Sequence, residues 1–156
     1  MDHRLRQIAD YFLACKDRKD VDPTALGSAL LPHIYVLRVE RLPPQPLKLR
    51  VSLTGTSLDT AFGRSLNGQF LESFLHGPRA VDVVRGFHHC ADTREPVWMR
   101  QVARVAGRLP RYVEGVAIYL EPGYIYGGLV MGEFADEIDV APFERISLQR
   151  RETIDS

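Results

Sequence analysis

Apolar and polar side chains alternate from Leu47 to Thr54, which predicts a β-strand with one buried face. Gly55 then allows a sharp turn, and a hydroxyl at Thr56 or Ser57 can cap a short apolar helix. A second break at Gly63 separates this helix from another short apolar segment. A strand followed by short helices, rather than by one long crossover helix, predicts an antiparallel sheet with small helices on one face.

The N-terminal pattern has the period of a helix. Apolar residues recur at helical spacing across residues 3–16, which predicts an amphipathic helix whose apolar stripe needs a cover. Asp22 and Pro23 are typical of a helix start, so we expect a short helix from there to Leu31. Pro32 should end it.

The rest of the chain reads as a first strand, the strand described above, and three later ones. The first two are joined by the proline-rich LPPQP turn, and a helix at 79–89 and a loop at 92–96 precede the last three. The five predicted strands are residues 33–41, 47–54, 97–105, 113–120 and 124–134.

The fourth predicted strand is apolar on both faces. One side carries Val116, Ile118 and Leu120, and the other carries Val113, Ala117 and Tyr119. Both faces of the sheet therefore need burial, because each exposed large side chain would forfeit roughly 1.5–3 kcal/mol. The central helices can cover one face. The N-terminal helix, a second copy of the chain, or both should cover the other, and we favour a homodimer over a monomer.

Several of these motifs occur together in one known fold. The strand ending in LTGT, the pair Phe62-Gly63, the triplet Leu66-Asn67-Gly68 and the apolar helix after them resemble the first half of a PAS domain. The segment VDPTALGSALLPHIYVLRVE resembles, more narrowly, a bacterial family of short stand-alone PAS proteins without an attached output domain. This likeness covers residues 21–134. It implies an α+β fold and a signalling partner such as a histidine kinase, and it transfers no catalytic residue. The Asn-Cys-Arg-Phe motif of flavin-binding relatives is missing, which disfavours a photochemical sensor.

Composition limits the possible partners. The chain has 156 residues, 45 % hydrophobic and 26 % charged, as expected for one globular domain. Twenty basic and twenty acidic residues cancel, which argues against a general nucleic-acid binder. There is no apolar run long enough for a membrane span and no secretory signal, so we expect a cytoplasmic protein. Cys15 and Cys90 should be reduced thiols.

A ligand pocket, if the protein has one, should lie between the sheet and the central helices. Seven candidate wall residues follow from the pattern: Leu53, Phe62, Phe70, Phe74, Val84, Phe87 and Trp98. Simple core packing is the alternative for nearly all of them. A buried Trp98 would need a partner for its indole N–H, either a ligand or a carbonyl. No residue pattern identifies a cofactor.

One short cluster has metal-binding chemistry. His88, His89 and Cys90, followed by Asp92, carry donors that can hold zinc, iron or haem. Adjacent helical residues point about 100° apart, however, so the spacing favours a structural helix end. No motif of a hydrolase, a phosphate-binding loop or a metalloprotease occurs. Gly127-Gly128 should mark a bulge or a close backbone contact.

These observations divide the chain into an N-terminal cap at 1–20, a PAS-like domain at 21–135 and a polar C-terminal tail at 136–156. We expect a regulatory protein and not an enzyme, one that binds a small ligand or a protein partner and signals through dimer or partner contacts. The alternatives are a dimerisation or scaffold module that binds no ligand and, less favoured, a small enzyme or metal-binding protein.

Overall fold

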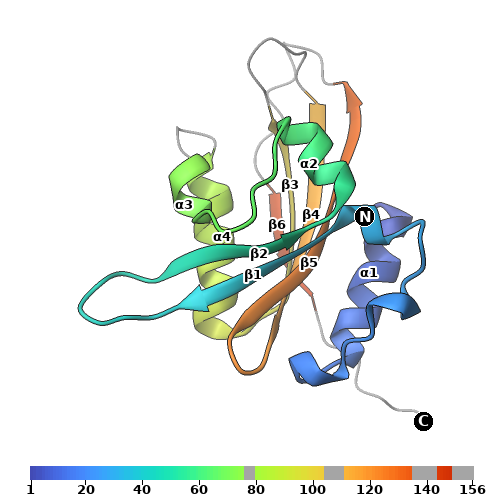
Figure 1. The fold of residues 1–156 in the computed structure, drawn as a ribbon. Coiled ribbons are helices and arrows are strands. Elements are labelled where there is room, and N and C mark those ends of the chain that lie inside the picture. Colours follow the sequence, from blue (N-terminus) through green and yellow to red (C-terminus); the bar gives the residue numbers. More distant parts are fainter. Residues whose placement is uncertain (76–79, 104–110, 135–143, 149–156) are drawn as a thin grey trace.

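One antiparallel sheet organises the protein, which is described here from a computed structural model over residues 1–75, 80–103, 111–134 and 144–148 (Figure 1). Across these residues the strand order is β2-β1-β5-β4-β3-β6. The strands are β1 (Ile34–Glu40), β2 (Lys48–Thr54), β3 (Val97–Ala103), β4 (Arg111–Leu120), β5 (Tyr124–Phe134) and β6 (Glu144–Ser147). The first hairpin joins the later meander where β1 pairs with β5, with Ile34 opposite Gly128. The predicted α+β class, with five neighbouring antiparallel strands in a PAS-like order, is confirmed.

The sheet has a sixth strand that the hydrophobic pattern did not indicate. β6 pairs with β3, and its Glu144 lies opposite Arg100. This strand falls within the stretch 136–156, for which we expected a polar tail. Its four residues are too few to show an alternating pattern, and only the edge of β3 gives them partners for their backbone groups.

The helices begin and end close to the predicted positions, with two differences. They are α1 (His3–Ala14), α2 (Thr56–Phe62), α3 (Leu71–Phe74) and α4 (Ala80–Thr93). α4 runs beyond the predicted end, to Thr93. The expected helix from Asp22 is replaced by 3₁₀ turns at Pro23–Ala25 and Leu31–His33, because Gly27 between them is left-handed (φ 79°). None of the helices in the described part of the chain combines the length and apolarity that a membrane span requires.

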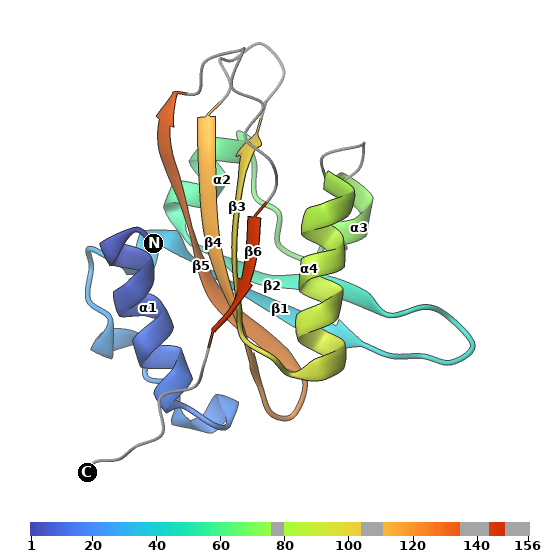
Figure 2. The same ribbon diagram turned by 180° about the vertical axis from the view of Figure 1, so that it is seen from behind.

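α1 covers one face of the sheet, as its apolar stripe predicted (Figures 1 and 2). Leu5, Ile8 and Phe12 are buried in a cluster with Val116 and Ile118 of β4. The N-terminal helix of the same chain therefore supplies this cover, which was one of the alternatives left open by the sequence.

The central helices cover the opposite face. Ala117 and Tyr119, the β4 residues of opposite parity, belong to a second buried cluster with Phe87 and Cys90 of α4. The two-sided burial predicted for this strand is thus confirmed. Because each face of the sheet has its own hydrophobic layer, a change in one layer can reach the other only through the strands.

Gly127 and Gly128 let both layers approach the backbone of β5. A Cβ at Gly127 would meet the carbonyl oxygen of Val116 and would lie 2.5 Å from the hydroxyl oxygen of Tyr35. A Cβ at Gly128 would lie 2.8 Å from Cδ1 of Ile8, on the other face. The prediction of a close backbone contact is confirmed at both residues, and each glycine serves a different face.

Candidate functional site

His88, His89, Cys90 and Asp92, whose spacing favoured a structural helix end over a metal site, lie near the C-terminal end of α4 and point to different neighbours. His88 Nε2 lies 2.6 Å from Oε2 of Glu72 on α3. The Glu72 carboxylate also accepts the N–H of Leu49, at 3.1 and 3.2 Å. Burial raises the pKa of Glu72, but the bonds from His88 and from backbone N–H groups prevail and hold it below its ordinary value. This contact ties α3 and α4 to the edge strand β2 and covers one of its backbone donors.

The other three members of the cluster are also engaged separately. His89 Nε2 lies 2.8 Å from Oε2 of Glu95, and the carboxylate of Asp92 accepts from Arg41 at 3.0 Å. The buried thiol of Cys90 donates to a carbonyl oxygen of β4 at 3.6 Å. Over the described ranges, no group of three or more potential metal ligands converges on one point. The geometry thus favours a structural helix end.

Two of the seven expected wall residues lie between the sheet and the central helices. Phe87 is buried, and its ring meets the Tyr35 ring edge-on at a centroid distance of 5.7 Å. The Tyr35 hydroxyl donates to the carbonyl oxygen of Val116 at 2.6 Å, and burial raises its pKa well above the ordinary value. Phe74 packs at the margin of the same cluster. These rings are core residues here, which is the alternative left open above.

Leu53 does not face this space, because a bulge reverses its side of the sheet. Val51 pairs with Leu37, but Leu53 pairs with Val36, so Ser52 is an extra residue in β2. Paired residues share a face, and Val36 belongs to the α1 side. One inserted residue therefore moves Leu53 to the other face of the sheet, where it is 49 % exposed.

Three further candidates lie toward the surface of the helical layer. Phe62 is 37 % exposed, and its ring meets that of Phe74 at a centroid distance of 6.0 Å. Phe70 lies beneath the guanidinium of Arg50, 4.1 Å from Cζ to the ring centroid. Val84 is half-buried. These contacts are packing and cation–π interactions of the fold.

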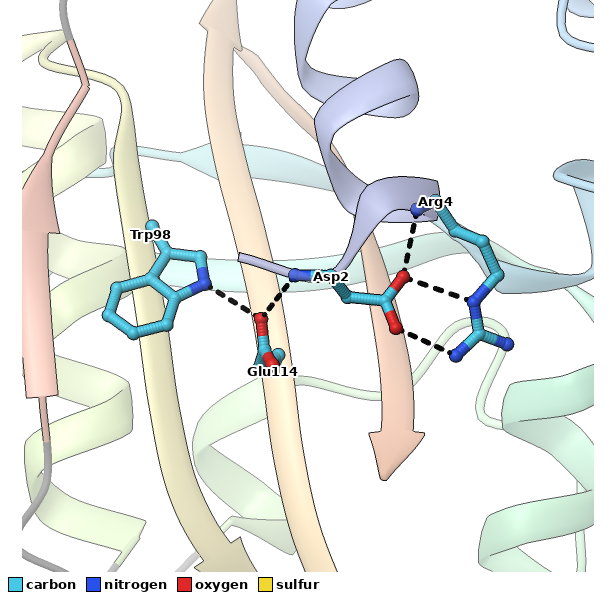
Figure 3. Close-up of polar contacts among 4 residues, drawn as sticks. All are labelled: Asp2, Arg4, Trp98 and Glu114. Carbon is cyan, nitrogen blue, oxygen red and sulfur yellow. Dashed lines mark hydrogen bonds and ion pairs between the residues drawn. The ribbon is translucent and has the colours of Figure 1, made fainter. Parts of the chain in front are cut away.

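Trp98 lies in the α1 layer, on the face opposite the expected pocket. Its indole N–H donates to Oε2 of Glu114 at 3.1 Å (Figure 3). The same carboxylate oxygen accepts the backbone N–H of Asp2 at 3.0 Å. The partner that a buried tryptophan required is therefore a carboxylate, and that carboxylate also holds the start of α1.

Both ends of α1 are attached to the sheet. Asp2 caps the helix and bonds the Arg4 side chain at 3.1 and 3.0 Å, as Figure 3 shows. The hydrogen bond from Arg4 lowers the pKa of Asp2 to about 2. Beyond the other end of α1, Arg18 donates to the hydroxyl oxygens of Tyr124 at 2.9 Å and Tyr126 at 3.1 Å.

A cavity of ≈ 340 Å³ lies beside α2, at the point where β1 leaves the ladder with β5. Its described lining comprises His33, Thr56, Ser57, Leu58, Thr60, Ala61, Leu129 and Met131. None of the seven residues expected to form a pocket wall contributes to it. Burial lowers the pKa of His33, and the nearby charge of Arg4 acts in the same direction.

The sequence contained a signal for this cavity that we interpreted otherwise. We expected a hydroxyl of Thr56 or Ser57 to cap α2, but the N-cap residue is Gly55 and no side chain makes a capping hydrogen bond to the start of the helix. A Cβ at Gly55 would meet the backbone carbonyl of Pro32, so a glycine is required here for close approach. The two hydroxyl residues line the cavity instead.

Comparison of the chain with protein-family models, with curated proteins and with solved structures returns no match. The fold and the geometry of the described residues therefore carry the functional argument.

Proposed function

We propose that this chain is a single-domain, PAS-like sensory or regulatory protein. It binds a small cytoplasmic ligand or a protein partner and signals through dimer or partner contacts, for example to a histidine kinase. The strand order β2-β1-β5-β4-β3, with residues of α2, α3 and α4 in one buried cluster on one face, is the observation that carries this proposal. The sequence resemblance to stand-alone PAS proteins supports the same class, and it is the source of the kinase as partner.

The proposed signal is a shift between two arrangements of the helices. A ligand that binds one arrangement more tightly raises the population of that arrangement and alters the surface that a partner meets. α2 and α3 suit this role because they are short and contact the sheet mainly at its β2 edge and at the 3₁₀ turn before β1. α1 is attached at both ends, so it serves as the fixed layer.

A scaffold without a ligand is the second candidate. The layer under α4 contains the protein's own aromatic and aliphatic side chains, including Tyr35 and Phe87, which favours a module that works through its surface alone. An enzyme or a metal protein built on His88 to Asp92 receives no such support, because the four side chains have separate partners.

Native mass spectrometry of freshly purified protein tests the proposal, with the denatured chain as the mass control. We expect a retained small molecule, bound to a monomer or to a dimer. A metabolite screen by thermal shift follows, since a ligand at 100 times its Kd adds about 2.7 kcal/mol and raises Tm by about 5–10 °C. A protein with no adduct and no responding metabolite, but with a stable dimer, would be the scaffold.

A further inference from the structure

We propose that the cavity beside α2 binds a small uncharged molecule that carries hydroxyl groups on an apolar skeleton. This inference rests on the proposed sensory function and specifies where its ligand lies and what chemistry it has. The volume of ≈ 340 Å³ falls within the roughly 300–1,000 Å³ of small-molecule sites. It lies beside α2, one of the central helices under which the sequence predicted a pocket, but its described lining contains none of the seven predicted wall residues.

The hydroxyl groups of α2 form the first polar side of the site. Thr56 and Ser57 lie in the first turn, and Thr60 follows Thr56 by four residues, so it lies on the same side of the helix. Gly55 is the N-cap, and its N–H donates to the carbonyl oxygen of Ile34 at 2.7 Å. The helix therefore starts without a side-chain cap, and the hydroxyls can act as donors and acceptors toward a ligand.

His33 forms the second polar side. β1 begins at Ile34, opposite Gly128, so the next β5 carbonyl, that of Leu129, has no β1 ladder partner. Contact of the His33 ring with the backbone of Leu129 acts on the ring's pKa in the direction opposite to burial, and burial has the larger effect. The imidazole is neutral at pH 7, because burial lowers its pKa below the ordinary value. A neutral ring that donates through one nitrogen keeps the other as an acceptor, which suits a ligand hydroxyl.

The remaining lining is apolar and uncharged. Leu58 is 5 % exposed, and Ala61, Leu129 and Met131 complete the described wall. No residue of the described lining carries a formal charge at pH 7. The two charges that act on His33, those of Arg4 and Asp2, are paired with each other. An ionic ligand would find no counter-charge in the described lining, whereas an aliphatic alcohol matches both its hydroxyl and its apolar walls.

NMR with two matched probes tests this inference. We expect 1,2-hexanediol to shift the backbone amides of residues 56–61 and 129–131 in a saturable manner. Hexanoate, a charged probe with the same number of carbons, should leave the chemical shifts of these amides unchanged. Ser57→Ala and Thr60→Val should each weaken the diol response about 2–10-fold, the range for loss of one neutral hydrogen bond.

A filled cavity provides the decisive variant. Ala61→Phe places a ring in the site, at a half-exposed helical position, and should abolish the saturable shifts. Ala14→Phe makes the same change at the exposed end of α1 and should preserve them. Circular dichroism of both variants verifies the fold.

Saturable shifts that survive Ala61→Phe, or that map under α4, would overturn this site and leave the sensory proposal intact. A response to hexanoate equal to that of the diol, or no saturable shift at all, would overturn the ligand class. Failure of the sensory proposal itself would show separately, as the absence of any adduct or stabilising metabolite.

Discussion

Replacing Gly128 by alanine tests whether α1 packs on the sheet as closely as described. The added Cβ would lie 2.8 Å from Cδ1 and 3.2 Å from Cγ2 of Ile8, and 3.3 Å from Cδ2 of Leu5. Both side chains are 0 % exposed, so neither can swing out into solvent to make room. Overpacking of this kind costs about 1–3 kcal/mol. The alanine also lowers the entropy of the unfolded chain, which stabilises the fold by about 0.4–1 kcal/mol. The net decrease in the free energy of unfolding should therefore be about 1–2 kcal/mol.

Urea unfolding of four variants measures this loss and its cause. Ile8→Val removes Cδ1, the atom nearest to the new methyl group, and alone should cost about 0.5–1.5 kcal/mol. In the Gly128→Ala background, Ile8→Val should cost almost nothing further, because the alanine methyl group occupies the space that Cδ1 vacates. The coupling free energy of the double-mutant cycle should therefore be about 1 kcal/mol. Gly132→Ala on the same strand is the matched control, since its nearest neighbour, Cβ of Tyr112, is at an ordinary 3.5 Å.

Equal stability of Gly128→Ala and Gly132→Ala would refute this account of α1 packing. Additive effects of Gly128→Ala and Ile8→Val, within about 0.5 kcal/mol, would do the same.

Three further changes probe the contacts of both layers. Gly127→Ala drives a methyl group into a β4 carbonyl and the Tyr35 ring, so we expect a loss above about 3 kcal/mol in urea unfolding; a milder loss would contradict the backbone contact. Glu114→Ala leaves the indole of Trp98 and the N–H of Asp2 without their acceptor, which should lower the free energy of unfolding by about 1–3 kcal/mol. The fluorescence of this single tryptophan should shift to longer wavelength, and unchanged emission would contradict the hydrogen bond between Trp98 and Glu114. The folded-state pKa of Asp2, about 2, lies below its unfolded value, so the stabilisation by the ionised carboxylate is present above about pH 4 and is lost as the pH falls toward 2. Asp2→Asn should remove this decrease in the free energy of unfolding from urea curves measured across that range. If the decrease persists in the variant, another group causes it.

Local periodicity was sufficient for the strands β1 to β5 and for α1. The alternation in residues 113–120 predicted two buried faces, and the structure places Val116 and Ala117 in different layers. The period of the apolar side chains shows which face of a strand or helix is buried, but it does not show which element covers that face. The N-terminal stripe likewise required a cover before any partner was known.

The pocket residues could not be assigned to a face by the same reasoning. Val97, Trp98 and Met99 are all apolar, so no contrast in polarity says which one faces α1. At Leu53 the alternation itself predicted the wrong face, because the bulge at Ser52 depends on how β2 pairs with β1.

What the sequence determined by itself was the five neighbouring strands, the two apolar faces of the sheet and the need for a cover on each face, since side-chain periodicity is a local property. What only the tertiary structure decided was the register of β2, the strand β6 and the cavity that joins His33 to α2. These depend on contacts between residues far apart in the chain, which no local pattern encodes.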